Sequence, residues 1–195
     1  MAIAAGAGAA GLTAGWVLSG EGWLTAGAPA VATVPRPRVV GDFTLLDVAG
    51  KAVRWADLSG HWQLVFFGFT HCPEACPTTL ANASRALADE ELEEHGLRVV
   101  FISVDPGRDT TEVVGKYVGR FGPGITGLTG DLAGIASAAA AFGVYFEKLP
   151  ATADGEYMVN HTASLFLLGP TDEILETIPY GATAPQIADA VQRHL

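Results

Sequence analysis

Short apolar runs alternate with helical apolar stripes along most of the chain. Two of the runs, 64–69 and 97–104, are dominated by Leu, Val, Ile and Phe, which is typical of strands covered on both faces of a sheet. Other runs are shorter and are bounded by Gly, Pro and Asp, as strands commonly are. The predicted strands are 43–47 and 52–55, which form an N-terminal hairpin, followed by 64–69, 97–104, 157–160, 164–168 and 174–178.

Four stretches place apolar residues at the three- and four-residue spacing of an amphipathic helix. The first is expected over 77–94 and connects the two most apolar strands, so a right-handed parallel crossover is predicted. The pattern as a whole predicts an α/β fold. The other helices are expected over 111–121, over 132–142 behind an Asp131 cap with Leu132, Ile135, Ala139 and Phe142 on one face, and over 183–195 behind a Thr183–Gln186 capping box with Ile187, Val191 and Leu195 on one face.

The first twenty residues contain no charged side chain and are mostly Ala and Gly. About twenty apolar residues suffice to span a bilayer, but few of these side chains are strongly apolar. A signal peptide requires a positive n-region, which is missing, although 26–28 has the small residues of a cleavage site. Residues 28–40 contain three prolines and predict an extended linker. We therefore expect residues 1–34 to be a weak membrane anchor or export leader plus linker, or a disordered leader, and 35–195 to be one folded domain.

Charge and cysteine content narrow the class of protein. The formal net charge of −10 and the absence of any run of three Lys or Arg residues exclude general nucleic-acid binding, because a negative surface repels phosphate. Charged residues are 16% of the chain and apolar residues 49%, so the composition is that of a globular protein. The two cysteines lie four positions apart, too close to staple a fold, so a chemical role explains them better.

Both cysteines lie in the segment 70–77, THCPEACP, where a buried strand is followed by a helix. Proline is favoured at the first helical position, so the helix is expected to begin at Pro77 with Cys76 as its N-cap. Free N–H groups and the helix dipole at that end stabilise a thiolate. Cβ atoms four residues apart in a helix are about 5–6 Å apart, and a disulfide needs about 3.5–4.5 Å, but a loop conformation relieves the mismatch. A reversible disulfide and a soft metal ion bound by Cys72 and Cys76 both stay open.

A metal site needs more than two thiolates. Thiolates favour Cu(I), and an added imidazole also allows Cu(II). His161 differs from the other histidines because it lies at the junction of two predicted strands, whereas His71 is adjacent to Cys72, and neighbouring residues rarely chelate one ion. The remaining histidines are expected to be surface residues: His61, His95 and His194.

Four segments occur in a specific order: FFGFTHCPEACP at 66–77, SVDPGRDT at 103–110, GLTG at 127–130 and YMVNH at 157–161. In this combination the chain resembles the Sco/SenC family over about residues 43–181. The resemblance implies a thioredoxin-like fold, with a central mixed sheet flanked by helices. It also implies that Cys72, Cys76 and His161 bind copper, as Cu(I) or Cu(II), and that Cys72 and Cys76 form a redox-active pair.

The same resemblance implies a membrane-tethered metallochaperone that helps assemble the CuA centre of cytochrome c oxidase. The implied partners are the oxidase subunit that carries CuA and another copper chaperone or a thioredoxin-like reductant. The implied location is extracytoplasmic, at the periplasmic face of the inner membrane. Two positions depart from the family pattern, since Asn160 stands where Asp is frequent and Gly107 where an acidic residue is common.

Three other functions compete with copper delivery. An extracytoplasmic thiol-disulfide oxidoreductase would act on partner cysteines, but thioredoxins usually have C-x-x-C and a facing cis-proline, and the segment 160–162 has no proline. A peroxiredoxin-like peroxidase has a threonine three residues before its cysteine, whereas Thr70 lies two before Cys72. A docking module without chemistry is disfavoured because all three candidate ligands are present. Whether the protein is also an enzyme stays open at this point.

Overall fold

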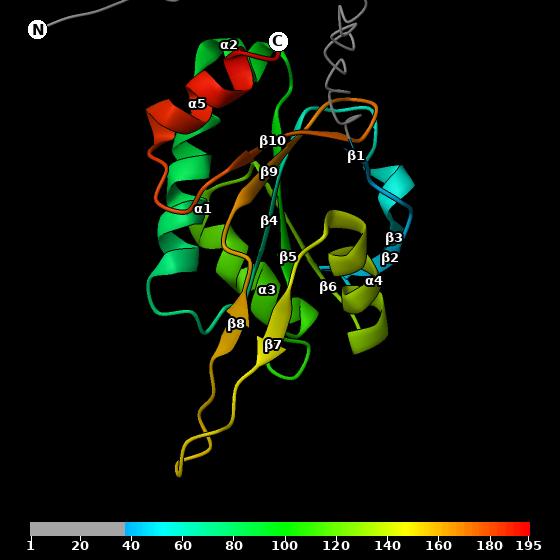
Figure 1. Ribbon diagram of the computed structural model, residues 1–195, viewed down its shortest axis with the longest axis vertical. Helices are drawn as coiled ribbons and strands as arrows, with labels where there is room; N and C mark the ends of the chain where they lie inside the picture. Colours follow the sequence, from blue (N-terminus) through cyan, green and yellow to red (C-terminus); the bar gives the residue numbers. More distant parts are fainter. Residues whose placement is uncertain (1–37) are drawn as a thin grey trace, which may run out of the picture. The chain divides into compact units, whose positions relative to one another are not determined.

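The computed structural model describes residues 38–195, and Figure 1 shows a central sheet with helices on both of its faces. The sheet has eight strands in the order β1-β10-β9-β4-β5-β6-β2-β3. The strand bounds are β1 (Arg38–Val39), β2 (Thr44–Asp47), β3 (Ala52–Arg54), β4 (Gln63–Gly68), β5 (Arg98–Ser103), β6 (Ile125–Thr129), β9 (Leu165–Leu168) and β10 (Glu173–Ile178). Strand β4 is buried at every position, as its apolar sequence predicts.

The sheet is mixed, as the family resemblance implies. Strand β4 pairs in parallel with β5, and β5 with β6, whereas β4 pairs antiparallel with β9. The predicted hairpin is confirmed as β2–β3, with Leu45 opposite Val53. Strand β6 was not predicted because Gly127 interrupts its apolar pattern. A Cβ atom at Gly127 would lie 2.7 Å from Val114 Cγ1, so the glycine gives space to the helix that packs there.

A second sheet holds one of the candidate ligands. Strands β7 (Phe146–Lys148) and β8 (Val159–His161) form an antiparallel ribbon beyond the ends of the main strands (Figure 1), with Phe146 opposite His161. His161 is therefore the last residue of a strand, whereas the sequence placed it at the junction after the predicted strand 157–160. The ladder continues past it, because the Thr162 N–H donates to the Tyr145 carbonyl at 3.0 Å.

Helices cover both faces of the sheet. Successive side chains of β4 point to opposite faces of the sheet, and both sets are apolar and need to be buried. Phe67 contacts Phe142 of α4 with ring centroids 5.2 Å apart, while Gly68, on the other face, lies next to Cys76 of α1. Helix α5 packs beside α1 (Figure 1). The helices are α1 (Ala75–Ala86), α2 (Glu90–Glu94), α3 (Thr111–Val118), α4 (Leu132–Phe142) and α5 (Ala184–Gln192), with single 3-10 turns at Trp55–Asp57 and Gly119–Phe121.

Three details of the predicted helices are wrong. The expected helix 77–94 is two helices, because the Asp89 carboxylate accepts hydrogen bonds from the N–H groups of Glu91 and Leu92 and so starts α2 as its N-cap. Leu132 is 62% exposed, since as the first residue of α4 it points away from the buried face. Leu195 is also exposed, because α5 ends at Gln192. The Thr183 capping box and the Asp131 cap are confirmed.

The predicted linker 28–40 extends too far, since β1 pairs with β10 and Val40 is buried. Within residues 38–195, the helices are all too short or too polar to cross a bilayer. The anchor or leader expected at 1–34 lies outside the described residues.

Candidate metal centre

The two cysteines occupy different positions around the start of α1. The helix begins at Ala75, two residues before the predicted Pro77, so Cys76 is its second residue and is fully buried. Pro77 is tolerated as the third residue because the first N–H groups of a helix have no internal partner, and the carbonyl four residues back lies outside the helix. Cys72 lies in the preceding turn and is half-buried, and both cysteines are free.

The thiolate belongs on Cys72 and not on Cys76, the reverse of the prediction from the N-cap. A hydrogen bond from the Cys76 thiol, together with backbone N–H groups that include that of Cys76 at 3.3 Å from Cys72 Sγ, lowers the pKa of Cys72 to about 5. The same pairing with Cys72, reinforced by burial, raises the pKa of Cys76. The reduced protein therefore has a half-buried thiolate at Cys72 and a buried thiol at Cys76 at neutral pH.

His161 approaches the cysteines from the β7–β8 ribbon. Its Nε2 atom lies 3.8 Å from Cys76 Sγ, and its Nδ1 lies 2.9 Å from the Thr162 carbonyl oxygen. Since a carbonyl only accepts, Nδ1 carries the proton and Nε2 keeps its lone pair toward the sulfur. The ring packs edge-on against Phe66 and Phe69, with centroids 6.2 and 5.8 Å away. Such an oriented imidazole has the arrangement common in metal-ligating histidines.

The structure brings Cys72, Cys76 and His161 close together, but their ligand atoms are not all close enough to bind one metal ion without a shift. In residues 38–195, the group His71, Asp105 and Asp109 has ligand atoms within 4.8 Å of one another, and the cysteine–histidine set does not meet that limit. The carboxylates of Asp105 and Asp109 in this group already accept hydrogen bonds from protein donors. We therefore interpret that group as a hydrogen-bond cluster.

A buried carboxylate supports the turn that leads to Cys72. Asp109 accepts hydrogen bonds from the Thr70 backbone N–H at 2.9 Å, the Thr70 hydroxyl at 2.6 Å and the Ser103 hydroxyl at 2.6 Å. Its side chain has no exposed surface, so these three donors are what stabilise its charge. The negative charge of Asp109 also contributes to the raised pKa of Cys76.

A second cluster connects the ribbon to the segment after β5. Asp105 accepts from the Tyr157 hydroxyl at 2.7 Å and from Arg108 Nε at 2.7 Å. The Arg108 guanidinium carbon lies 3.5 Å from the centroid of the Tyr157 ring, and Lys148 Nζ lies 3.8 Å from it. Because Tyr157 is in the chain segment that enters β8, this cation–π stack helps to hold the strand that ends in His161. In the sequence, the 105–109 segment stands out through the family resemblance.

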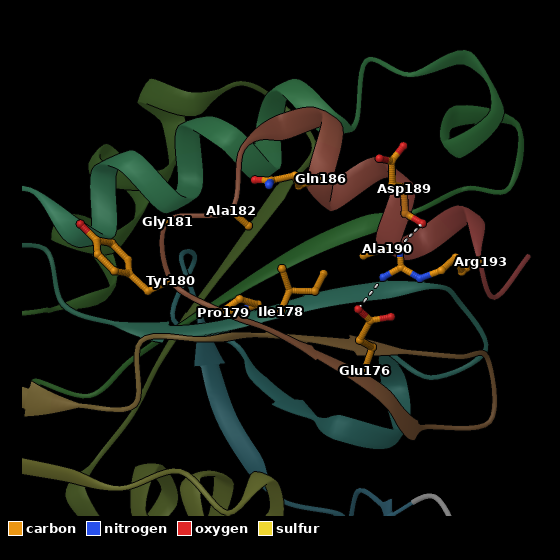
Figure 2. A pocket seen from close by; sticks show the side chains of 10 residues that line it. All are labelled: Glu176, Ile178, Pro179, Tyr180, Gly181, Ala182, Gln186, Asp189, Ala190 and Arg193. Carbon is orange, nitrogen blue, oxygen red and sulfur yellow. Dashed lines mark hydrogen bonds and ion pairs between the residues drawn. The ribbon is translucent and has the colours of Figure 1, made fainter.

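A separate cavity of about 440 Å³ lies between the end of β10 and α5 (Figure 2). Arg193 crosses it and bonds Glu176, with Nη2 and Oε1 2.7 Å apart. Its lining contains no cysteine, histidine or methionine, so it is unrelated to the cysteine chemistry.

Known proteins match both the sequence and this geometry. The family model described as SCO1/SenC matches residues 31–195. The chain belongs to the SCO1/SenC family. The human Protein SCO2 homolog, mitochondrial, is 40% identical over 158 residues, which are 80% of this chain and 59% of that protein. The chain thus spans less than two thirds of the length of this curated relative.

Two solved SCO1/SenC structures show the same fold. One is ScoI of Arabidopsis thaliana with copper bound, with a TM-score of 0.75 and 35% identity over 80% of this chain and 96% of that chain. The other is ScoI of Bradyrhizobium japonicum with copper bound, with a TM-score of 0.71 and 37% identity over 80% of this chain and 99% of that chain. The family and the thioredoxin-like fold implied by the sequence are therefore confirmed.

Proposed function

We propose that this SCO1/SenC chain is a copper-binding metallochaperone that helps assemble the CuA centre of cytochrome c oxidase. In this proposal Cys72, Cys76 and His161 bind the copper ion that the protein delivers. The observation that carries the proposal is the approach of His161 Nε2 to within 3.8 Å of Cys76 Sγ, at the start of the helix that follows Cys72. Two related structures named as copper-bound support the choice of metal.

The chemistry of the donor set also supports copper. Thiolates select Cu(I), and an imidazole added to two thiolates accommodates Cu(II) as well. Zinc prefers a closed set of four protein ligands in structural sites, and the described residues offer three here. Cys72 is partly exposed whereas Cys76 is buried, so an acceptor's ligand would approach copper from the side of Cys72.

The names of related proteins support a proposal for the cellular setting. Curated relatives are named mitochondrial, and one solved relative is named a lipoprotein. We infer an extracytoplasmic protein in which residues 1–34 tether the folded domain 35–195 to the membrane that carries the oxidase, on its periplasmic face in a bacterium. The oxidase subunit with CuA is then the acceptor, and another copper chaperone or a thioredoxin-like protein supplies copper or electrons.

Anaerobic competition for Cu(I) against a chromophoric chelator tests the proposal. The reduced wild-type chain should bind one Cu(I) tightly, and Cys72→Ala or Cys76→Ala should abolish tight binding. His161→Ala should weaken binding about tenfold or more, equivalent to about 1.4 kcal/mol. The matched control is His95→Ala, which changes an exposed histidine at the end of α2 and should leave the affinity unchanged. Native affinity in either cysteine variant would refute the ligand assignment.

A thiol-disulfide oxidoreductase is the second candidate function, and the lowered pKa of Cys72 favours it. The Cys72 thiolate would attack a partner disulfide, and Cys76 would then release the reduced partner by forming the Cys72–Cys76 disulfide. Disulfide reductase turnover that is unaffected by His161→Ala, in a protein that binds no Cu(I), would support this function over copper delivery.

A further inference from the structure

The turn between β5 and α3 contacts both halves of the proposed copper site. Arg108 and Asp109 both donate their backbone N–H groups to the Asp105 carbonyl, at 3.2 and 2.9 Å, which fixes the turn. The Asp109 carboxylate binds Thr70 in the segment that leads to the cysteines. The Arg108 side chain instead contacts the β7–β8 ribbon, whose second strand ends at His161. One short turn therefore touches the cysteine side and the histidine side of the site.

The Arg108 guanidinium is held with an incomplete set of hydrogen bonds. Its side chain is 16% exposed. Its Nε donates to the Asp105 carboxylate at 2.7 Å, and its Nη1 lies 3.7 Å from the carboxylate of the exposed Glu156. Its Nη2 is buried and has no hydrogen-bond partner among residues 38–195. A buried donor left unpaired costs about 1–3 kcal/mol, so hydrogen bonding alone does not explain the place of this group.

Two aromatic rings contact the guanidinium, one from the ribbon and one from the cysteine side. Its central carbon lies 3.5 Å from the centroid of the Tyr157 ring and 5.9 Å from that of the Phe69 ring. Cation–π attraction acts within about 6 Å, and the planar guanidinium also stacks on aromatic faces, which an ammonium group does not. Phe69 follows β4, and its carbonyl accepts the Cys72 N–H at 3.3 Å. Arg108 therefore joins the ribbon to the start of the cysteine turn.

Both rings that contact Arg108 also hold His161. The Phe69 ring meets the imidazole edge-on, with centroids 5.8 Å apart. Tyr157 lies four positions before His161, and its hydroxyl donates to the buried Asp105 carboxylate at 2.7 Å. A Cβ atom at Gly107 would lie 3.2 Å from this hydroxyl oxygen, so the glycine leaves room for the bond. The imidazole is thus fixed through its ring by Phe69 and through its strand by Tyr157.

We propose that Arg108 is a positioning residue that sets how His161 approaches the cysteines, and thereby the preference of the site between Cu(II) and Cu(I). The inference rests on the proposed function as a copper chaperone. Two thiolates suffice for Cu(I), whereas Cu(II) binding draws on the imidazole as well. A displaced imidazole therefore weakens Cu(II) binding more than Cu(I) binding. Arg108 gives no ligand atom to the metal and acts through His161.

The substitution Arg108→Lys tests this role, because lysine keeps the positive charge beside Asp105 but loses the planar contact with the two rings. The Cu(II)/Cu(I) potential of the copper-loaded full chain is measured by spectroelectrochemistry on the thiolate-to-Cu(II) charge-transfer band. Arg108→Lys should weaken Cu(II) binding about tenfold more than Cu(I) binding, which raises the potential by about 59 mV.

The matched control is Arg54→Lys. Arg54 Nε also donates to a carboxylate, that of Asp42 at 3.2 Å, but its side chain is 62% exposed on β3. This control should leave the potential unchanged. An unchanged potential in Arg108→Lys, or an equal change in Arg54→Lys, overturns the proposal.

A second readout needs no copper. The imidazole NMR signals of His161 in the reduced, copper-free protein are assigned as those missing from His161→Ala. Arg108→Lys should shift these signals and Arg54→Lys should not; unshifted signals in Arg108→Lys overturn the positioning role. If Arg108→Lys does not fold, Tyr157→Leu removes the ring from the ribbon side and should raise the potential similarly. Tyr157→Phe keeps the ring and should raise it less, and the reverse order would contradict the stacking argument.

Combination with His161→Ala separates positioning from a direct electrostatic effect. In that background Arg108→Lys should leave the potential unchanged, because no imidazole remains to be placed. A further rise of the same size overturns the proposal. A native potential in Arg108→Lys, together with tight Cu(I) binding by the wild-type chain, overturns the positioning role and leaves the chaperone proposal standing. Failure of the wild-type chain to bind Cu(I) tightly overturns the proposed function itself.

Discussion

The most demanding test of the site concerns Asp109, because its carboxylate joins three segments of the chain. It accepts hydrogen bonds from Thr70, in the turn before Cys72, and from Ser103 at the end of β5. The Asp109 carbonyl accepts from the Thr129 hydroxyl of β6 at 2.8 Å. The substitution Asp109→Ala removes the carboxylate contacts but keeps this last one, so its effect isolates the side chain.

The size of the effect follows from the three donors that lose their acceptor. A buried donor left unsatisfied costs about 1–3 kcal/mol, but the two hydroxyls can rotate toward other acceptors and the Thr70 N–H cannot. Taking the lower end for the hydroxyls, we expect Asp109→Ala to lower the free energy of unfolding by about 3–5 kcal/mol. Asp109→Asn retains one carbonyl oxygen with two lone pairs, so its loss should be about 1–2 kcal/mol.

Urea unfolding followed by circular dichroism measures both losses, and the Cu(I) competition assay measures the consequence for the site. Both variants should bind Cu(I) more weakly than wild type, since the turn that presents Cys72 is less fixed. Asp131→Ala is the matched control, because it removes an N-cap bond to Gly134 of α4. It should cost about 1 kcal/mol and leave Cu(I) binding unchanged. A loss below about 1 kcal/mol in Asp109→Ala would refute the argument.

Two further predictions concern the sulfur atoms. Gly68→Ala places a Cβ atom 2.9 Å from Cys76 Sγ, so we expect a lower free energy of unfolding and about tenfold weaker Cu(I) binding. Gly127→Ala is the control, because its Cβ atom would lie 2.7 Å from Val114 Cγ1, away from the cysteines. It should lower the free energy of unfolding by about 1–3 kcal/mol and leave the Cu(I) affinity unchanged. Alkylation of reduced protein by iodoacetamide should modify Cys72 with a midpoint near pH 5, since the thiolate is protonated as the pH falls through its pKa. Cys76→Ala should move that midpoint upward because it removes the strongest stabilising hydrogen bond; an unshifted midpoint would contradict this cause.

The order of strands and helices could be predicted because the buried elements differ in period. The continuous apolar run of β4 and the stripe of α4, which ends at Gly143 in the left-handed conformation, are local signals. Errors arose where a long-range contact decides the structure. Strand β6 has Gly127 because α3 packs against it, and β1 forms only because β10, more than a hundred residues later, pairs with it.

The candidate site shows the same division. Cys72 and Cys76 are recognisable from spacing, whereas His161 is marked only weakly by its place at a strand junction and more strongly by its place in the family pattern. Its contact with Cys76 spans 85 positions of sequence, which no local pattern encodes. The assignment of the thiolate to Cys76 failed for a physical reason, since the pairing with Cys72 and then burial raise the pKa of Cys76. The support from Asp109 was not foreseen because its partners lie 6 and 39 positions away.

The proposed ligands differ in how firmly the fold holds them, and this difference has a functional consequence. Cys76 is fully buried against Gly68, and the His161 ring is packed between aromatic side chains. Cys72 is half-buried and lies in a turn outside the helix. The Thr70 N–H of that turn donates a hydrogen bond to the Asp109 carboxylate. Because the three ligand atoms do not all lie within 4.8 Å of one another, binding one ion to all of them requires at least one of these side chains to shift, and we expect the shift at Cys72, the one ligand that lies outside a helix or strand. Disulfide formation with Cys76 would also consume the Cys72 sulfur, so copper capture and thiol oxidation compete for one residue.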